Sequence, residues 1–102
     1  MWRDKRQLSI PEAAEKDSQA IEILRVWRTR EQQYVSLRAG VWDDPAAWGI
    51  LLVDIARHVT NSYEQTKGLD PIETLERIKT VWGAEMESPT DTPSGQVRDD
   101  GL

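Results

Sequence analysis

The side chains best suited to chemistry in this chain are those of Asp54, Arg57 and His58. His58 is the only histidine, and Asp54 precedes it by four residues. On a helix this spacing puts both side chains on one face, so the carboxylate could orient the imidazole as a general base. The serines and threonines, however, lie outside any motif typical of a nucleophile. We therefore favour the interpretation that His58 is a helix residue with a local polar partner, and we assign no catalytic residue.

The sequence predicts no metal site and no cofactor. With one histidine and no cysteine, the chain offers few of the ligands that zinc prefers. It also lacks a glycine-rich phosphate-binding loop. The absence of cysteine excludes disulfides and a thiol nucleophile, and it fits a reducing cytoplasm.

A second group of candidate residues lies in two apolar segments. Arg25, Trp27, Tyr34 and Arg38 alternate with aliphatic residues, so we expect them on one face of a hairpin, the arginine–aromatic face. Aromatic residues beside arginines are typical of sheets that bind single-stranded nucleic acid. We favour the alternative that tryptophans such as Trp27 and Trp48 are packing anchors at an interface.

The distribution of charge weakens the nucleic-acid interpretation without excluding it. The formal net charge is −5, from 13 basic and 18 acidic residues. Residues 83–102 contain five acidic side chains and one arginine, so most of the excess lies there. Residues 21–82 are close to neutral, with eight basic and nine acidic side chains. The net charge therefore indicates solubility and says little about partners.

The apolar segments themselves predict two strands. Residues 21–29 and 34–42 are rich in Ile, Leu, Val and Trp, and a short polar link between them is typical of a hairpin. Alternation divides their side chains between two faces. The face expected to lie toward the helices contains Leu24, Val26, Val35, Leu37, Ala39 and Val41. The opposite face adds Ile21, Ile23 and Ser36 to the arginine–aromatic face.

A helix is predicted directly after the hairpin. Asp43 or Asp44 can cap it, and Pro45 suits its first position. Apolar residues at spacings of three and four continue to about residue 67, where Gly68 is a suitable stop. Its apolar arc is wide, which indicates contact with more than one neighbour.

A second helix is predicted to open at Asp70, which caps it, with Pro71 in the first position. We expect it to end at Gly83 or nearby. The element order is therefore β-β-α-α, and the predicted fold class is α+β, with a two-stranded antiparallel hairpin packed on two helices.

The two ends of the chain are expected to lie outside this domain. Residues 85–102 combine prolines, glycines and acidic residues with little apolar surface, which predicts a disordered tail. Residues 1–20 are predicted to form a mobile arm, although residues 11–16 suit a short helical turn. Residues 21–84 then form a single domain. No segment matches a membrane span or a secretory signal, so we expect a cytoplasmic protein that does not bind membranes.

A chain of this kind is expected to form a homodimer. About 62 structured residues bury too little surface for high stability, and an isolated hairpin is marginal. One hairpin face would also leave Ile23 and Trp27 in water unless something covered them. A two-fold dimer, with the hairpins paired edge to edge or stacked, is the simplest solution.

Three segments resemble a family of small, uncharacterised proteobacterial proteins that is defined only as a domain of unknown function. They are Leu-Arg-Val-Trp at residues 24–27, Ala-Ala-Trp-Gly-Ile-Leu-Leu-Val-Asp at residues 46–54, and the pair Arg57 and His58. The resemblance covers about residues 20–66. It implies a bacterial, cytoplasmic protein and brings no activity or catalytic residue with it.

The leading hypothesis is thus a small homodimeric interaction or accessory protein without catalysis, with a protein partner as a further option. The first alternative is single-stranded nucleic-acid binding through the arginine–aromatic face. The third hypothesis is an enzyme or small-ligand binder that uses Trp48, Asp54, Arg57 and His58.

Overall fold

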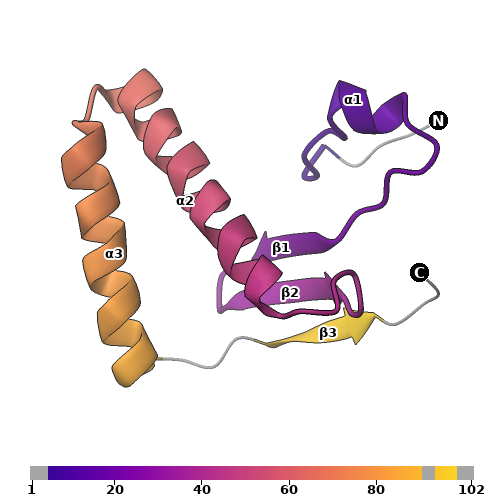
Figure 1. Ribbon diagram of the computed structural model, residues 1–102. Helices are drawn as coiled ribbons and strands as arrows, with labels where there is room; N and C mark the ends of the chain where they lie inside the picture. The colour runs from indigo at the N-terminus through magenta and orange to yellow at the C-terminus, as the bar shows by residue number, and fades with distance from the viewer. Residues whose placement is uncertain (1–4, 91–93, 99–102) are drawn as a thin grey trace.

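The computed structural model describes residues 5–90 and 94–98 of the 102-residue chain (Figure 1). In chain order its elements are α1 (Glu12–Glu15), β1 (Leu24–Arg28), β2 (Gln33–Arg38), α2 (Ala46–Lys67), α3 (Pro71–Glu87) and β3 (Ser94–Arg98). The predicted α+β class and the β-β-α-α order are confirmed. A short helix precedes that unit and a third strand follows it.

The hairpin has the register that the alternation predicted. β1 and β2 are antiparallel, with Leu24 opposite Leu37 and Val26 opposite Val35. Since successive side chains point to opposite sides of a strand, these four residues form one side of the hairpin, here called the aliphatic face. The arginine–aromatic face is therefore the other side of the same two strands.

Both strands are shorter than predicted. β1 begins at Leu24 rather than at residue 21, and β2 ends at Arg38 rather than at residue 42. At the hairpin turn, Thr29 N donates to the carbonyl of Gln32 at 2.9 Å and closes the loop. After β2, Gly40 adopts a φ of 74°, which redirects the chain toward α2 and ends the ladder.

The third strand is a correction to the sequence analysis, which expected two strands. The disorder of the C-terminal tail stays a prediction. β3 lies beside β2 in parallel, so the sheet order is β1-β2-β3. A parallel pair needs a long crossover, and the two helices supply it. The edge of β2 offers backbone hydrogen bonds to a segment whose own residues favour a strand only weakly. Residues 91–93 and 99–102 of the predicted tail lie outside the described residues.

Helix α2 has the start and stop predicted for it. Oδ1 of Asp44 accepts a hydrogen bond from the backbone N–H of Ala46 at 2.9 Å, and Pro45 already has helical angles. At the other end Gly68 has a φ of 66°, and its N–H donates to the carbonyl of Glu64. A left-handed glycine of this kind commonly ends a helix.

Helix α3 begins as predicted and runs further than predicted. Oδ2 of Asp70 accepts from the N–H of Glu73 at 3.0 Å, and Pro71 is the first helical residue. The helix passes Gly83 and continues to Glu87. A glycine costs a helix interior only about 1 kcal/mol, and the residues that follow Gly83 are good helix formers.

The N-terminal arm includes the helical turn that residues 11–16 suggested. It appears as the four-residue α1, whose Glu12 pairs with Lys16. Leu8, an apolar residue of this arm, is 93% exposed. The mobility of this arm stays a prediction.

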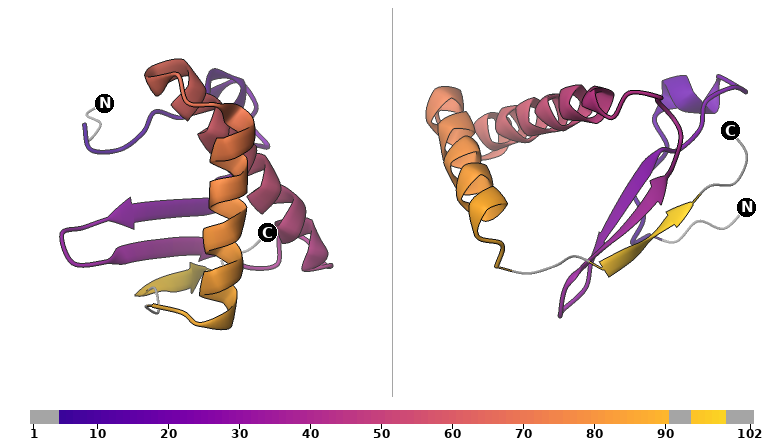
Figure 2. Two further views of the ribbon diagram at one scale, coloured as in Figure 1. Left: turned by 90° about the vertical axis from the view of Figure 1, so that its left-hand side faces the viewer. Right: turned by 60° about the horizontal axis from the view of Figure 1, so that its bottom comes forward.

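The helices do not cover the sheet. α2 packs against α3, while within the described residues neither helix contacts a strand. Figure 1 shows α2 extending away from the sheet and α3 running back beside it, and the second view in Figure 2 shows α3 set apart from the strands. The aliphatic face is thus not packed on the helices of its own chain, as the sequence analysis expected, because α2 leaves the sheet at a steep angle.

The chain consequently has an open shape. Its radius of gyration is 15.9 Å, whereas a compact domain of this length has about 13 Å. No apolar side chain among the described residues is buried. Along the same residues, no helix is both long and apolar enough to cross a lipid bilayer.

Candidate functional site

The arginine–aromatic face brings together the four hairpin residues that the sequence singled out. Arg25 lies opposite Ser36 and Trp27 lies opposite Tyr34, and Arg38 follows on β2. Tyr34 is exposed, whereas the two arginines and Trp27 are half-buried. The prediction that these side chains share a face is confirmed, and their role in binding stays a prediction.

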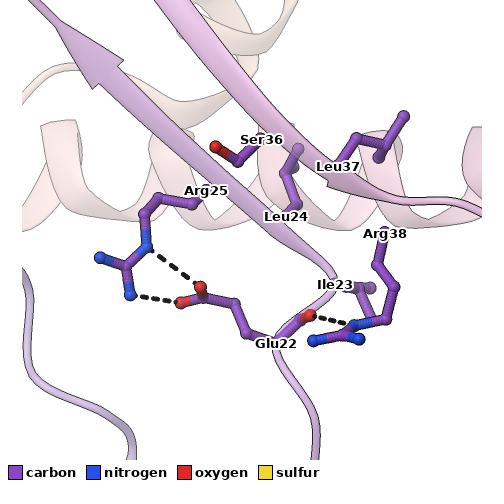
Figure 3. Close-up of a pocket in the computed structure, with 7 residues that line it drawn as sticks. All are labelled: Glu22, Ile23, Leu24, Arg25, Ser36, Leu37 and Arg38. Atoms are coloured by element: carbon purple, nitrogen blue, oxygen red, sulfur yellow. Dashed lines mark hydrogen bonds and ion pairs between the residues drawn. The ribbon is translucent and has the colours of Figure 1, made fainter. Parts of the chain in front are cut away.

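Glu22, two residues before β1, contacts both arginines of this face (Figure 3). Nε and Nη2 of Arg25 donate to Oε1 and Oε2 of Glu22 at 3.0 and 2.9 Å. Nε of Arg38 donates to the carbonyl oxygen of Glu22 at 3.0 Å. The hydrogen bond and the negative charge of Glu22 raise the pKa of Arg25. Because this two-pronged pairing is also how arginine holds a phosphate, Glu22 occupies the donors that a nucleic acid would need.

The ring of Trp27 is also engaged. The guanidinium carbon of Arg6 lies 5.9 Å from the centroid of that ring, a distance typical of a cation–π contact. Arg6 comes from the N-terminal arm, so this arm reaches the aromatic surface that we considered for base stacking. A stacked base would have to displace it.

A hollow of about 360 Å³ lies at this end of the hairpin. Its lining consists of Glu22, Ile23, Leu24, Arg25, Ser36, Leu37 and Arg38. The volume falls in the range of ligand pockets, which are mostly apolar with a few unpaired polar groups. Here the side chain of Arg25 and Nε of Arg38 instead bond to Glu22, so the hollow resembles a structural junction more than a binding pocket.

The helix candidates do not form a shared site. Asp54, Arg57 and His58 are exposed on α2, and no hydrogen bond or ion pair joins any two of them in the part of the chain that the structure describes. The contact between Asp54 and His58 that their spacing allowed is not formed, because an exposed pair gains little over hydration by water. Trp48 lies in the first turn of the helix instead, and its ring packs on that of Trp42.

A second pocket, of about 490 Å³, was missed by the sequence analysis. It lies where α2 and α3 meet, and its lining consists of Val59, Tyr63, Leu69, Asp70, Glu73, Thr74, Arg77 and Ile78. The sequence did contain a signal for this pocket, because the apolar stripes of the two predicted helices converge on the turn at Gly68. Nζ of Lys67 also lies 5.7 Å from the ring of Tyr63 at this end of the molecule.

Neither region has the ligands of a metal centre. Over residues 5–90 and 94–98, no group of three or more His, Cys, Asp or Glu side chains could hold a metal ion. Thr60 is the one buried polar residue in this part of the chain, with 5% exposure, and its Oγ1 has no hydrogen-bond partner. The sequence carried no signal for that buried hydroxyl.

The fold and this surface define a small α+β protein with an open architecture. Residues 7–90 match the model of a family described as a domain of unknown function, DUF5076, and the chain belongs to that family. The match is wider than the resemblance seen over residues 20–66, and it confirms a small uncharacterised family.

A solved structure from the photosynthetic bacterium Rhodopseudomonas palustrus is similar to this chain. The two share 35% sequence identity with a TM-score of 0.72, over 94% of this chain and 97% of the other. That protein carries the provisional name of a pyruvate dehydrogenase. The comparison with curated proteins found no match.

Proposed function

We propose that this protein is a non-catalytic interaction protein that works as a homodimer. The observation that carries the proposal is the absence of a buried apolar side chain in the described residues. The chain exposes 9289 Å² of surface, whereas a compact monomer of 11.7 kDa exposes about 5,900 Å². An excess of total surface on this scale, in a chain with no buried apolar side chain among its described residues, is typical of a chain that folds against a partner.

A second copy is the partner that fits the size of this excess. The surplus is roughly 3,400 Å² for one chain. If each of two copies covered half of its surplus, the interface would bury about 3,400 Å² in total, and obligate homodimers bury about 2,000–5,000 Å². A two-fold dimer also requires no other protein to be present in a fixed ratio.

Sedimentation equilibrium on the purified chain tests the proposal. We expect a mass of twice 11.7 kDa and an unfolding midpoint that rises with protein concentration, because association and folding are coupled. A chain that stays folded as an 11.7 kDa species on dilution, with a constant unfolding midpoint, would refute the homodimer.

The provisional name of the solved relative gives the enzymatic alternative a definite substrate, pyruvate. Oxidative decarboxylation of a 2-oxo acid depends on a cofactor such as thiamine diphosphate to stabilise the carbanion. The residues described here do not fit that cofactor's metal-bound diphosphate, since they provide no cluster of metal-ligating side chains. We expect no NADH to form when the dimer is incubated with pyruvate, thiamine diphosphate, Mg²⁺, coenzyme A and NAD⁺. Turnover that co-purifies with the chain and is lost in His58→Ala would favour the enzyme instead.

A further inference from the structure

We propose that two copies of the chain join through the free edge of β1 (Leu24–Arg28), so that their sheets continue into each other across a two-fold axis. The inference rests on the proposed homodimer and specifies which edge meets in it. Figure 1 shows β1 at the border of the sheet, with β2 between it and β3. One side of β1 is therefore paired, and the other is not.

The hydrogen bonds of the hairpin show which backbone groups of β1 point to the free edge. Arg38 N donates to the carbonyl of Ile23 at 3.0 Å, ahead of the strand. Thr29 N donates to the carbonyl of Gln32 beyond it. Because hydrogen-bonded and non-hydrogen-bonded pairs alternate along an antiparallel ladder, the odd-numbered residues of β1 bond to β2. The N–H and C=O groups of the even-numbered residues point outward, and no hydrogen bond joins them to any described residue. These residues are Leu24, Val26 and Arg28.

An unpaired edge of this kind is satisfied by another extended strand. Natural sheets commonly protect such an edge with a proline, a lysine or a bulge, and β1 has none of the three. The charge of Arg25 is already paired, since its Nη2 donates to Glu22 at 2.9 Å. At the middle of the strand, Val26 is 54% exposed. The edge is therefore open to a strand partner.

A second copy of β1 fits this edge because the edge is self-complementary. With the two-fold axis at Val26, all five residues of the strand are paired, and three hydrogen-bonded pairs provide about six bonds between the copies. Leu24 then lies opposite Arg28 of the second copy, and Arg25 lies opposite Trp27. A guanidinium beside an indole ring is a favourable cross-strand pair.

Other two-fold registers are less favourable. An axis at residue 25 pairs only residues 24–26 of the strand and places Arg25 opposite its own copy, where like charges repel. An axis at residue 27 pairs only residues 26–28. The sequence of β1 thus selects the register centred on Val26.

The N-terminal arm contacts β1 through the same indole ring. In the single chain the guanidinium of Arg6 lies 5.9 Å from the centroid of the Trp27 ring. In the joined sheet Arg25 of the second copy reaches that ring from across the strands. One guanidinium replaces another, so Trp27 keeps a cation–π contact when Arg6 gives way.

Cross-linking of single cysteines distinguishes this edge contact from a stack of two hairpin faces, since the chain has no native cysteine. The full-length variants Val26→Cys and Val35→Cys are each treated with a short bis-maleimide reagent. Val35 is the matched control, because it lies opposite Val26 in the hairpin and on the same face. In the joined sheet the two copies of residue 26 lie about 5.5 Å apart, whereas the two copies of residue 35 lie three strand spacings apart, roughly 14 Å. Stacked faces would separate both pairs by about 10 Å.

Proline at position 26 tests the outward-pointing N–H directly. Val26→Pro removes this donor but leaves the bonds between β1 and β2, because the N–H of residue 26 does not point to β2. Val26→Ala is the control, since it shortens the side chain and keeps the N–H. Circular dichroism checks that both variants fold, and sedimentation equilibrium measures the dissociation constant of the dimer.

We expect Val26→Cys to give a yield of cross-linked dimer at least about five-fold higher than Val35→Cys. Val26→Pro should raise the dissociation constant at least about ten-fold relative to Val26→Ala. Equal yields from the two cysteine variants, or a folded Val26→Pro that dimerises as tightly as Val26→Ala, would overturn the edge contact while leaving the homodimer intact. A native chain that sediments as a folded monomer would overturn the homodimer itself, and the inference with it.

Discussion

Trp42 and Trp48 meet edge to face at the entrance to α2, with ring centroids 5.2 Å apart and planes inclined by 76°. Trp42 lies in the loop that carries the chain from the hairpin into the helix, and Trp48 lies in the first turn of that helix. Edge-to-face rings of this kind attract each other beyond the effect of burial alone. The pair therefore helps to set the direction in which the helices leave the sheet.

We expect this contact to appear as a coupling energy in a double-mutant cycle. Trp42→Leu, Trp48→Leu and the double variant are unfolded in urea and followed by circular dichroism. The sum of the two single losses should exceed the loss in the double variant by about 0.5–1.5 kcal/mol, because each single substitution already removes the same ring contact. Strict additivity would show that the rings only happen to lie near each other.

Two glycines should respond to alanine in opposite directions. Gly68 has a φ of 66°, so Gly68→Ala is expected to lower the free energy of unfolding by about 1 kcal/mol. Gly83 lies inside α3, where alanine favours the helix by up to about 1 kcal/mol.

The pair is matched because a Cβ at either position meets no atom within 4 Å. The difference between the stability changes of Gly68→Ala and Gly83→Ala then reports backbone conformation alone. Chemical denaturation of both variants at one protein concentration provides the measurement. An unchanged stability in Gly68→Ala would mean that the helix ends in another way in solution.

Substitution of His58 and Asp54 should have little effect on stability. Both side chains are exposed and neither pairs with the other in the described residues. His58→Gln and Asp54→Asn are each expected to change the free energy of unfolding by less than about 0.5 kcal/mol, as is usual for surface positions. Thermal unfolding at a fixed concentration measures this. A loss above about 2 kcal/mol in either variant would reveal a contact that the single chain does not contain.

Labelled single-stranded oligonucleotides should bind weakly or not at all at physiological salt. Arg25 and Arg38 are bonded to Glu22, and Arg6 lies over Trp27, so the arginine–aromatic face offers few open contacts. Fluorescence anisotropy across a range of salt concentrations provides the test. Saturable, salt-dependent binding that disappears in the Arg25→Ala, Arg38→Ala variant would establish nucleic-acid binding instead.

Local chemistry explains which parts of the fold could be predicted. The caps at Asp44 and Asp70 and the stop at Gly68 depend on neighbouring residues, so the sequence contains the whole signal. Alternation likewise predicted which hairpin residues share a face. The strand ends were less certain, because a conformation such as that of Gly40 is not visible in a hydrophobic pattern.

The features that were missed depend on residues far apart in the sequence. β3 forms by pairing with β2 across both helices, and its own composition predicts little. The contact of Arg6 with Trp27 joins the arm to the hairpin, and no local pattern records it. The sequence analysis also expected the helices to pack on the sheet of the same chain. That packing is not made, and Val26 on the aliphatic face is exposed.

The lack of a closed apolar interior has a consequence for the cell that makes this protein. In the proposed homodimer, a newly synthesised chain completes its fold only when it meets another copy. A given fractional decrease in synthesis therefore causes a larger fractional decrease in the amount of folded protein. A cell that halves its synthesis near the dissociation constant would lose more than half of its functional protein. The unpaired chains would be open to proteolysis, which keeps single copies from accumulating.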